Sequence, residues 1–483
     1  MKSKSVLVCF FLTVCVCQIT ALAGSFETQV AVLSAENATV QVTGKLSDGE
    51  KLWSFVDSSA NAEKLAEKIF NLQFFDERGT EISFIKRSAG EFETSRAAAS
   101  FSYKVKLDFP RPATQAAHIS WLTKDQGLLM INDLLPDLGD QTVTGKITFV
   151  LPANWKIETS EEKTGENEFQ AVNPHGAIFL VGNFSEQTLQ FEKTQLNLAR
   201  VGEWSFTASE MFDLTTSILT QHKSIFGSLP FGKIEILLIP LPQKIGGELW
   251  EAETRGSTVV LCAATIAFKS RALSKLHEQL RHELFHLWIP NNLNLTGDYA
   301  WFYEGFTIYQ ALKTGVRLKY IRFEDFLDVI GRAYDAWRFN STGKTLSLIE
   351  ASRLRWSANL SELVYAKGMT AAFICDLTLL QKSGGKQSLD DIFRELYRRH
   401  QKPNGAQNAN QIVLEMLKMK PELRVTIETY VEQPGEIDWT ADLTTAGLQN
   451  VSKISLTRLA VNNKLTRQQK KLLAQLGYQA IEN

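Results

Sequence analysis

The sequence has few cysteines, no excess of charge of either sign and, after its first 23 residues, no long apolar run. Of five cysteines in 483 residues, Cys9, Cys15 and Cys17 fall close to the N-terminus. Cys262 and Cys375 remain, each within an apolar segment, and this number excludes a disulfide-based scaffold. We expect both to pack as small buried side chains.

The charge balance excludes another class of partner. Lysine and arginine total 52, aspartate and glutamate total 53, and no basic block interrupts the chain. This composition gives no support for nucleic-acid binding. Apolar residues (44%) and charged residues (22%) occur at the levels of a globular protein. Since no later run of 18 apolar residues occurs, we expect a soluble mature protein without a transmembrane segment.

The first residues are typical of a secretory signal. Lys2 and Lys4 precede a short apolar run over 6–17, and 21–23 read Ala-Leu-Ala, a small-residue cleavage site. Residues 1–23 are therefore predicted to be a signal peptide, with the mature chain beginning at Gly24 and secreted or periplasmic. The alternative is a retained membrane anchor.

The periodicity divides the rest of the chain. Residues 24–205 alternate between apolar and polar positions and predict an all-β domain of antiparallel strands. Residues 206–450 form a small α+β layer followed by helices, and 451–483 form a short helical tail. A capping box at Thr207 and Glu210 predicts a helix start, after which strands are expected over 233–239 and 257–263, with a loop over 240–256.

His282, Glu283 and His286 form an H-E-x-x-H pattern. A helix turns by about 100° per residue, so residues four apart lie on one face and both imidazoles can bind one ion. The adjacent glutamate can then act as general base. The helix is expected to end at Pro290. Chance occurrence is the alternative, but the apolar surroundings favour a metal, because buried polar groups require a partner.

Glu304 follows His286 by 18 residues, at the start of a second predicted helix. A catalytic zinc requires three protein ligands and one open position, and Glu304 completes a His, His, Glu set. One zinc per chain is therefore predicted. His277, about 140° away from His282 around the helix, is expected to be solvated and not a ligand. The aromatic residues near Glu304 are expected to line a pocket or the core: Trp301, Phe302, Tyr303, Phe306.

These residues resemble the gluzincin aminopeptidases, which include aminopeptidase N and leukotriene hydrolase, and above all the related glycyl aminopeptidase family. Residues 286–293 resemble its H-x-W-x-P-x-x-L, and 301–309 resemble its W-x-x-E-G-F-T-x-Y. Residues 253–258 resemble E-H-R-x-S-T, with Thr254 in place of histidine, and 365–368 resemble Y-x-K-G. The resemblance covers about 205–450 and implies a thermolysin-like catalytic domain.

The resemblance also implies roles for individual residues. Tyr365 would be the catalytic tyrosine, although an interior structural tyrosine is the alternative. Glu253 would bind the amino terminus of the substrate, with Glu248 and Glu251 as competing acids. Gly246 and Gly247 would let the backbone approach the substrate, or simply form a tight turn.

Two departures from the family pattern stand out. The G-x-M-E-N loop of aminopeptidase N is absent, and the residues after 450 are too few for the C-terminal PDZ domain of many members. The prediction is a zinc aminopeptidase acting on peptides with a free N-terminus. A zinc endopeptidase or another zinc hydrolase, and a non-catalytic binding protein of the same fold, remain alternatives; the oligomeric state stays open.

Overall fold

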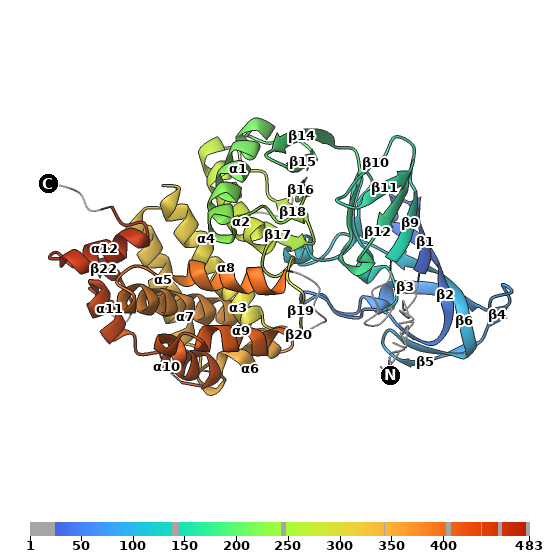
Figure 1. Cartoon of the computed structure of the whole chain (residues 1–483). Coiled ribbons are helices and arrows are strands. Elements are labelled where there is room, and N and C mark those ends of the chain that lie inside the picture. Colours follow the sequence, from blue (N-terminus) through green and yellow to red (C-terminus); the bar gives the residue numbers. More distant parts are fainter. Residues whose placement is uncertain are drawn as a thin grey trace, which may run out of the picture.

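The computed structural model describes residues 25–137, 144–242, 248–341, 343–401, 407–435, 437–452 and 456–479. An N-terminal β region, a central sheet and a helical region follow one another along the molecule (Figure 1). The predicted order of an N-terminal all-β domain, an α+β layer and a mainly helical C-terminal part is confirmed. The predicted signal peptide lies outside the described residues.

The N-terminal region contains two sheets packed face to face. A nine-stranded sheet has the order β11-β12-β9-β1-β2-β6-β3-β4 with β5 beside β6, and a four-stranded sheet has the order β10-β13-β8-β7. Phe101 of the first sheet and Phe179 of the second share one buried core. The strands are β1 Ser25–Ser34, β2 Thr39–Ser54, β3 Ile69–Phe75, β4 Glu81–Ile82, β5 Phe84–Ser88, β6 Glu91–Lys106, β7 Trp121–Leu122, β8 Gln126–Met130, β9 Thr144–Val150, β10 Lys156–Glu158, β11 Glu162–Gly165, β12 Glu168–Ala171 and β13 Ile178–Gly182.

The central sheet has five strands in the order β14-β15-β16-β18-β17. They are β14 Ser185–Phe191, β15 Thr194–Arg200, β16 Lys233–Pro240, β17 Trp250–Arg255 and β18 Thr258–Ala263. β16 and β18 lie where the sequence predicts strands, whereas the segment 240–256, predicted as a loop, contains β17. In β17, Glu251, Glu253 and Arg255 alternate with residues that face α2. The backbone of β17 pairs with β18 in antiparallel fashion. β14 and β15 precede the boundary predicted at 205 yet pair in this sheet.

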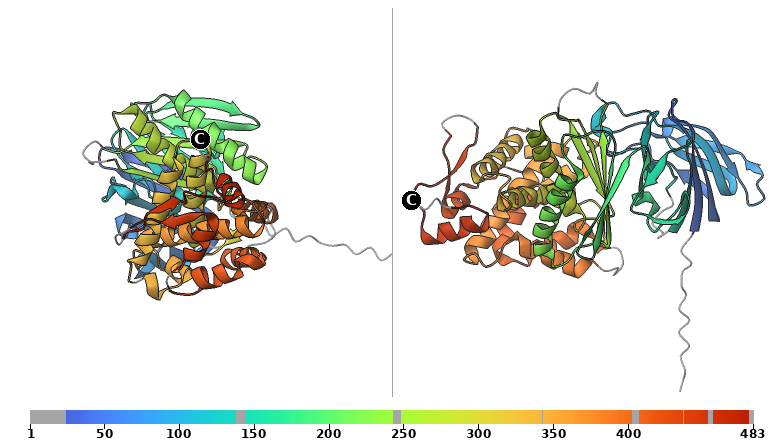
Figure 2. Two further views of the ribbon diagram at one scale, coloured as in Figure 1. Left: turned by 90° about the vertical axis from the view of Figure 1, so that its left-hand side faces the viewer. Right: turned by 90° about the horizontal axis from the view of Figure 1, so that it is seen from above.

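Both faces of the central sheet are covered. Side chains such as Ile236 pack against the helices, whereas Leu237 and Val260 pack against the four-stranded sheet of the N-terminal region. Alternate residues of a strand point to opposite faces, so one short apolar strand joins the two regions. Viewed from above, the N-terminal β region lies on one side of this sheet and the helices lie on the other (Figure 2).

The helical region surrounds two crossing helices, α4 and α7. The helices are α1 Ala208–Phe226, α2 Lys269–His286, α3 Ala300–Tyr303, α4 Gly305–Arg317, α5 Phe323–Arg338, α6 Leu348–Arg353, α7 Ser361–Lys382, α8 Leu389–His400, α9 Ala409–Lys418, α10 Arg424–Ile427, α11 Thr440–Ala446 and α12 Arg467–Gln475. Short strands β19 Leu295–Thr296, β20 Gln407–Asn408, β21 Leu448–Asn450 and β22 Leu459–Val461 join them. By length and composition α7 alone among the described helices could cross a membrane, but 94% of its apolar window is buried inside the protein, as in a core helix.

Several local predictions are confirmed. The capping box is present, with the Thr207 side chain accepting a hydrogen bond from the Glu210 backbone N–H, and α1 follows it. Cys262 and Cys375 are free and buried. The tail contains the predicted helix as α12. The helix α2, in contrast, ends at His286 and not at Pro290, since proline disfavours the helical conformation of the residue before it and the last residues form turns.

Two glycines let α7 approach the start of α4. A Cβ on Gly368 would lie 2.6 Å from the Trp301 carbonyl oxygen and 2.8 Å from the Gly305 Cα. A Cβ on Gly305 would lie 2.5 Å from the Gly368 Cα. This contact therefore sets the distance between the helix that follows Glu304 and the helix that carries Tyr365.

Gly368→Ala should destabilise the protein by about 1–3 kcal/mol, because overpacking a tight contact forces backbone shifts. Urea unfolding measures this loss. Gly232→Ala is the matched control, since Gly232 lies at an exposed position with no atom within 4 Å of an added Cβ. Equal stability of both variants would show that the helix crossing tolerates a methyl group.

Candidate metal centre

The last two turns of α2 carry His282, Glu283 and His286. The Nε2 atoms of the two histidines lie 2.9 Å apart, as expected for residues on one face of a helix. His286 is 6% exposed, and its Nδ1 lies 2.9 Å from the Ile289 carbonyl oxygen. That bond places the proton of a neutral ring on Nδ1 and leaves the Nε2 lone pair directed at His282.

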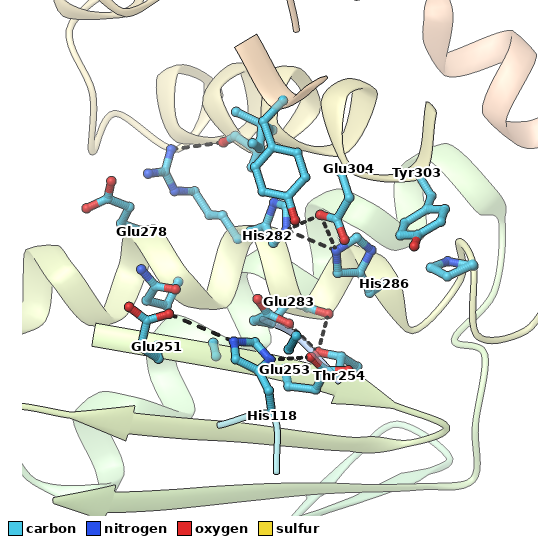
Figure 3. A pocket seen from close by; sticks show the side chains of 18 of the residues that line it. His118, Glu251, Glu253, Thr254, Glu278, His282, Glu283, His286, Tyr303 and Glu304 are labelled. Atoms are coloured by element: carbon cyan, nitrogen blue, oxygen red, sulfur yellow. Dashed lines mark hydrogen bonds and ion pairs between the residues drawn. The ribbon is translucent and has the colours of Figure 1, made fainter. Parts of the chain in front are cut away.

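Glu304 reaches the same point from the junction of α3 and α4. Its Oε2 lies 3.1 Å from His282 Nε2 and 3.5 Å from His286 Nε2. One ligand atom from each of the three residues lies within 4.8 Å of the other two. Figure 3 shows the two imidazoles and the carboxylate directed at one another above the strand that carries Thr254.

These three groups fit a zinc ion. Tetrahedral zinc with bonds of about 2.0–2.1 Å separates its ligand atoms by about 3.3 Å, and the observed separations span 2.9 to 3.5 Å. Two imidazole nitrogens that face each other need a proton or a metal ion between them. The set of two histidines and one glutamate matches the ligand choice of catalytic zinc sites, which leave one position open.

The electrostatics of the set agree with a cation site. Burial opposes the charge on His286, but Glu304 outweighs it and raises the pKa of His286 to about 9. Burial would also raise the pKa of Glu304, yet His286 and His282 hold it well below the usual range. The site thus holds an ionised Glu304 carboxylate that stabilises positive charge on the neighbouring imidazoles. A zinc ion at this point would supply that positive charge in place of a proton.

Glu283 lies on the neighbouring strip of α2 and is 5% exposed. Its Oε2 accepts a hydrogen bond of 2.6 Å from the Thr254 hydroxyl, which also donates to the Glu283 carbonyl oxygen at 3.1 Å. Thr254 therefore fixes the side chain to its own backbone, and Oε1 stays available. The threonine at the position where the related family has histidine thus orients the predicted general base.

A cleft of about 720 Å³ surrounds the three metal-ligand candidates. β17 forms one wall as the edge strand of the central sheet. The Thr254 carbonyl oxygen accepts a hydrogen bond from Asn291, on the side of β17 that does not pair with β18. Backbone groups two residues apart in an edge strand point to the same side. The backbone groups of Ala252 are therefore expected to point to this unpaired side as well. Ser59, Ala60 and His118 of the N-terminal region line the cleft as well.

Two tyrosines line this cleft. Tyr365 is half-buried on α7, and burial first, then the charge of Glu304, raises its pKa well above the usual range. Tyr303 accepts a hydrogen bond of 3.4 Å from Arg355, which also pairs with Asp298 at the start of α3. The other predicted aromatic residues are core residues, each fully buried: Trp301, Phe302, Phe306.

The three competing acids differ in their surroundings. Glu248 pairs with Arg271 and does not line the cleft. Glu251 and Glu253 both line it, on the face of β17 opposite α2. The Glu253 carboxylate contacts two cationic side chains: His118 through Nδ1 at 2.6 Å and Arg255 through Nε at 3.0 Å. Burial opposes its charge, but these two cations hold the pKa of Glu253 at about 2.

One sequence prediction, on His277, is partly wrong, and another, on two glycines, falls outside the described residues. His277 is not among the ligand candidates, yet it is 2% exposed and not solvated, because the Tyr320 ring stacks on it at 3.6 Å. Burial lowers its pKa to about 3. Gly246 and Gly247 lie outside the described residues, so their proposed approach to the substrate stays a prediction.

His118 is the cleft residue that sequence reasoning missed. It lies in an irregular segment before β7, 135 residues from the glutamate that it contacts. Its neighbours in the sequence are small and apolar and form no motif. Arg255 forms an ion pair with the same glutamate. It belongs to the segment that resembles E-H-R-x-S-T, so the sequence pattern could have indicated it. Only the packing of the N-terminal region on the central sheet reveals His118.

Known proteins match this chain through their solved structures. No protein-family model matches the sequence. No curated protein matches it either. Solved structures do match: an aminopeptidase N family protein from Idiomarina loihiensis superposes with a TM-score of 0.75 at 17% identity, over 92% of this chain and 82% of that one.

An M1 zinc metallopeptidase from Deinococcus radiodurans is also similar, with a TM-score of 0.53 at 12% identity over 86% of this chain and 96% of that one. A mutant of that protein, solved with a Tyr-Ser-Ala substrate, matches with the same values. At such identities the likeness shows the fold, and at that level the resemblance to the gluzincin aminopeptidases is confirmed.

Zinc should stabilise the folded protein by about 2.7 kcal/mol at a free concentration one hundred times its Kd. We expect Glu304→Ala to lose most of this stabilisation, because it removes one of the three ligand candidates. A thermal unfolding titration with zinc measures it. Glu278→Ala is the matched control, since this exposed acid lies on α2 one turn before His282. Equal zinc stabilisation in both variants would remove Glu304 from the ligand set.

Proposed function

We propose that this chain is a zinc-dependent aminopeptidase of the glycyl aminopeptidase type, which hydrolyses the first peptide bond of peptides. One observation carries the proposal: the metal-ligand set, a buried glutamate and an acid-bearing edge strand meet in one cleft. His118 and its neighbours from the N-terminal region wall that cleft beside the two acids. A wall at this point favours a peptide whose N-terminus lies in the cleft over a peptide chain that continues on both sides of it.

Zinc, when bound, supplies a Lewis acid that polarises a carbonyl group and lowers the pKa of water. Glu283 would accept a proton from the attacking water and deliver it to the leaving amine. Thr254 occupies its Oε2, so Oε1 is the oxygen that exchanges the proton. His282, His286 and Glu304 would hold one zinc per chain.

Tyr365 would donate a hydrogen bond to the oxygen that becomes negative in the transition state. Such a donor must stay protonated at neutral pH, and the raised pKa of Tyr365 ensures this. Tyr303 also lines the cleft, and its hydroxyl accepts a hydrogen bond from Arg355 while keeping its own O–H as a donor, so it is the second candidate. The position of Tyr365 on α7, in the lining of the same cleft as the metal-ligand candidates, supports this role.

Glu253 is the best candidate for binding the ammonium of the substrate. A carboxylate that binds the ammonium must be ionised and fixed in position. The pKa of Glu253 of about 2 keeps it ionised, and its two cationic partners fix its position. A carboxylate has about four lone-pair sites, so two partners leave room for another donor. Glu251, also in the cleft, is the second candidate, and Glu248 is the least favoured because it does not line the cleft.

Peptides with a free N-terminus are the proposed partners. The similar metallopeptidase solved with a Tyr-Ser-Ala substrate supports a peptide ligand. The signal-like N-terminus supports secretion or export to a periplasm, with cleavage after Ala23. Sequencing the N-terminus of the exported protein tests this localisation.

Tyr365→Phe should lower kcat by about 10²–10³, because it removes an oxyanion donor and little volume. Single-turnover kinetics on an aminoacyl anilide measure the loss, and zinc content should be unchanged. Tyr430→Phe, a tyrosine outside the cleft, is the control for a lost hydroxyl. A fall of less than about threefold would return Tyr365 to a structural role.

Glu253→Ala should weaken kcat/KM for free-amine substrates by about 2–5 kcal/mol and leave N-acetylated ones almost unchanged. Comparing both substrates on both enzymes forms a double-mutant cycle. Glu248→Ala is the control, as it lies outside the cleft.

The same experiment separates the alternatives. Coupling to Glu251→Ala in place of Glu253→Ala would move the anchor to Glu251 and keep the aminopeptidase function. Equal cleavage of blocked peptides at internal bonds would establish an endopeptidase. Peptide binding without any turnover would indicate a non-catalytic binding protein.

A further inference from the structure

His118 lies between two carboxylates of the cleft. Its Nδ1 is 2.6 Å from Glu253 Oε2, and its Nε2 faces Glu251 Oε2 at 3.9 Å. The first distance is a strong charge-assisted hydrogen bond, whereas the second is too long for a hydrogen bond. Figure 3 shows the ring below α2 with one glutamate on either side.

The charges of this cluster balance. Glu251 and Glu253 contribute two negative charges, and Arg255 with a protonated His118 contributes two positive ones. All four side chains are between 17% and 28% exposed. A net charge in such a partly desolvated place is costly. An arriving substrate ammonium would make the cluster positive unless one positive charge left.

We propose that the substrate's ammonium takes the place of the second proton of His118, so that amine binding releases one proton from this histidine. This inference rests on the proposed aminopeptidase function and concerns how the same cleft binds the amino terminus. The only covalent bond that changes is the Nε2–H bond of His118, whose electron pair stays on Nε2. The Nε2–H proton passes to solvent, while Nδ1–H still donates to Glu253.

Geometry selects the proton that leaves. The Nδ1–H proton is held by Glu253 at 2.6 Å, whereas the Nε2–H proton has no hydrogen bond to Glu251. A neutral ring therefore keeps Nδ1–H and exposes an Nε2 lone pair to the cleft. The ammonium has three N–H donors, and this lone pair adds an acceptor beside the two carboxylates.

The charged groups around the ring support a proton that is present before binding and absent afterwards. Burial opposes its charge, but Glu251 and Glu253 raise the pKa of His118 to about 10. Arg255 faces it through a hydrogen bond of 3.2 Å from Nη2 to the His118 carbonyl oxygen. An ammonium would offset both carboxylates and so remove what holds the proton.

The test uses the full-length protein, loaded with zinc and carrying Glu283→Gln so that it binds without turnover. Alanyl-alanine and N-acetyl-alanyl-alanine are titrated by calorimetry in buffers of different ionisation heat. At about pH 6.5 the peptide amine is already protonated. We expect the free dipeptide to release about one proton per site and the acetylated one to release none.

Two further variants identify the source of the proton. Adding His118→Gln, which keeps a donor for Glu253 but no titrating group, should abolish the release. Adding Glu251→Gln keeps His118 but removes one carboxylate, and should reduce the release to well below one. His175→Gln is the matched control in the N-terminal region outside the cleft, and should release as many protons as the parent.

The outcomes separate the two proposals. Preferential binding of the free dipeptide without proton release, or with release that persists in His118→Gln, overturns the exchange and leaves the aminopeptidase function intact. Equal binding of the free and acetylated dipeptides, or binding of neither, overturns the aminopeptidase function and this inference with it.

Discussion

The active cleft depends on the mutual approach of His282, His286 and Glu304. Two imidazole nitrogens 2.9 Å apart and a carboxylate oxygen within 3.5 Å of both need a proton or a metal ion among them. A zinc ion held by these three groups would join helix α2 to the start of α4. The other features of the cleft matter because they keep these two helices, and the groups around them, at this separation.

Two contacts maintain that separation at α4. Gly305 and Gly368 bring α7 against its first turn, where any larger residue would collide with backbone. Further along, buried Lys313 pairs with Asp376 of α7 at 2.9 Å and with Asp390 at 2.8 Å. Breaking a buried ion pair is costly, so this contact holds α4 against α7. The ligand candidate Glu304 and the phenol of Tyr365 are thereby brought to the same cleft.

The sequence predicted what depends on local periodicity. The i, i+4 spacing of two histidines, the capping box at Thr207 and the buried cysteines follow from helix geometry and apolar context alone. It missed what depends on contacts between distant segments. β17 needs β18 as a partner before its charged residues form a strand, and Tyr320 buries His277 from beyond α4. His118 meets Glu253 only after two domains pack together, and no local pattern encodes that meeting.

The N-terminal region therefore does more than support the central sheet. Its four-stranded sheet packs on the face opposite the helices, and His118 extends from this packed layer to the edge strand. The region that lines one side of the cleft also brings His118 to the acids there. Because the contact rests on the same apolar core that joins the domains, the charge at the proposed amino-terminal site is coupled to their packing. Loosening that interface would remove His118 from Glu253, whereas Arg255 on the same strand would keep its contact with that glutamate.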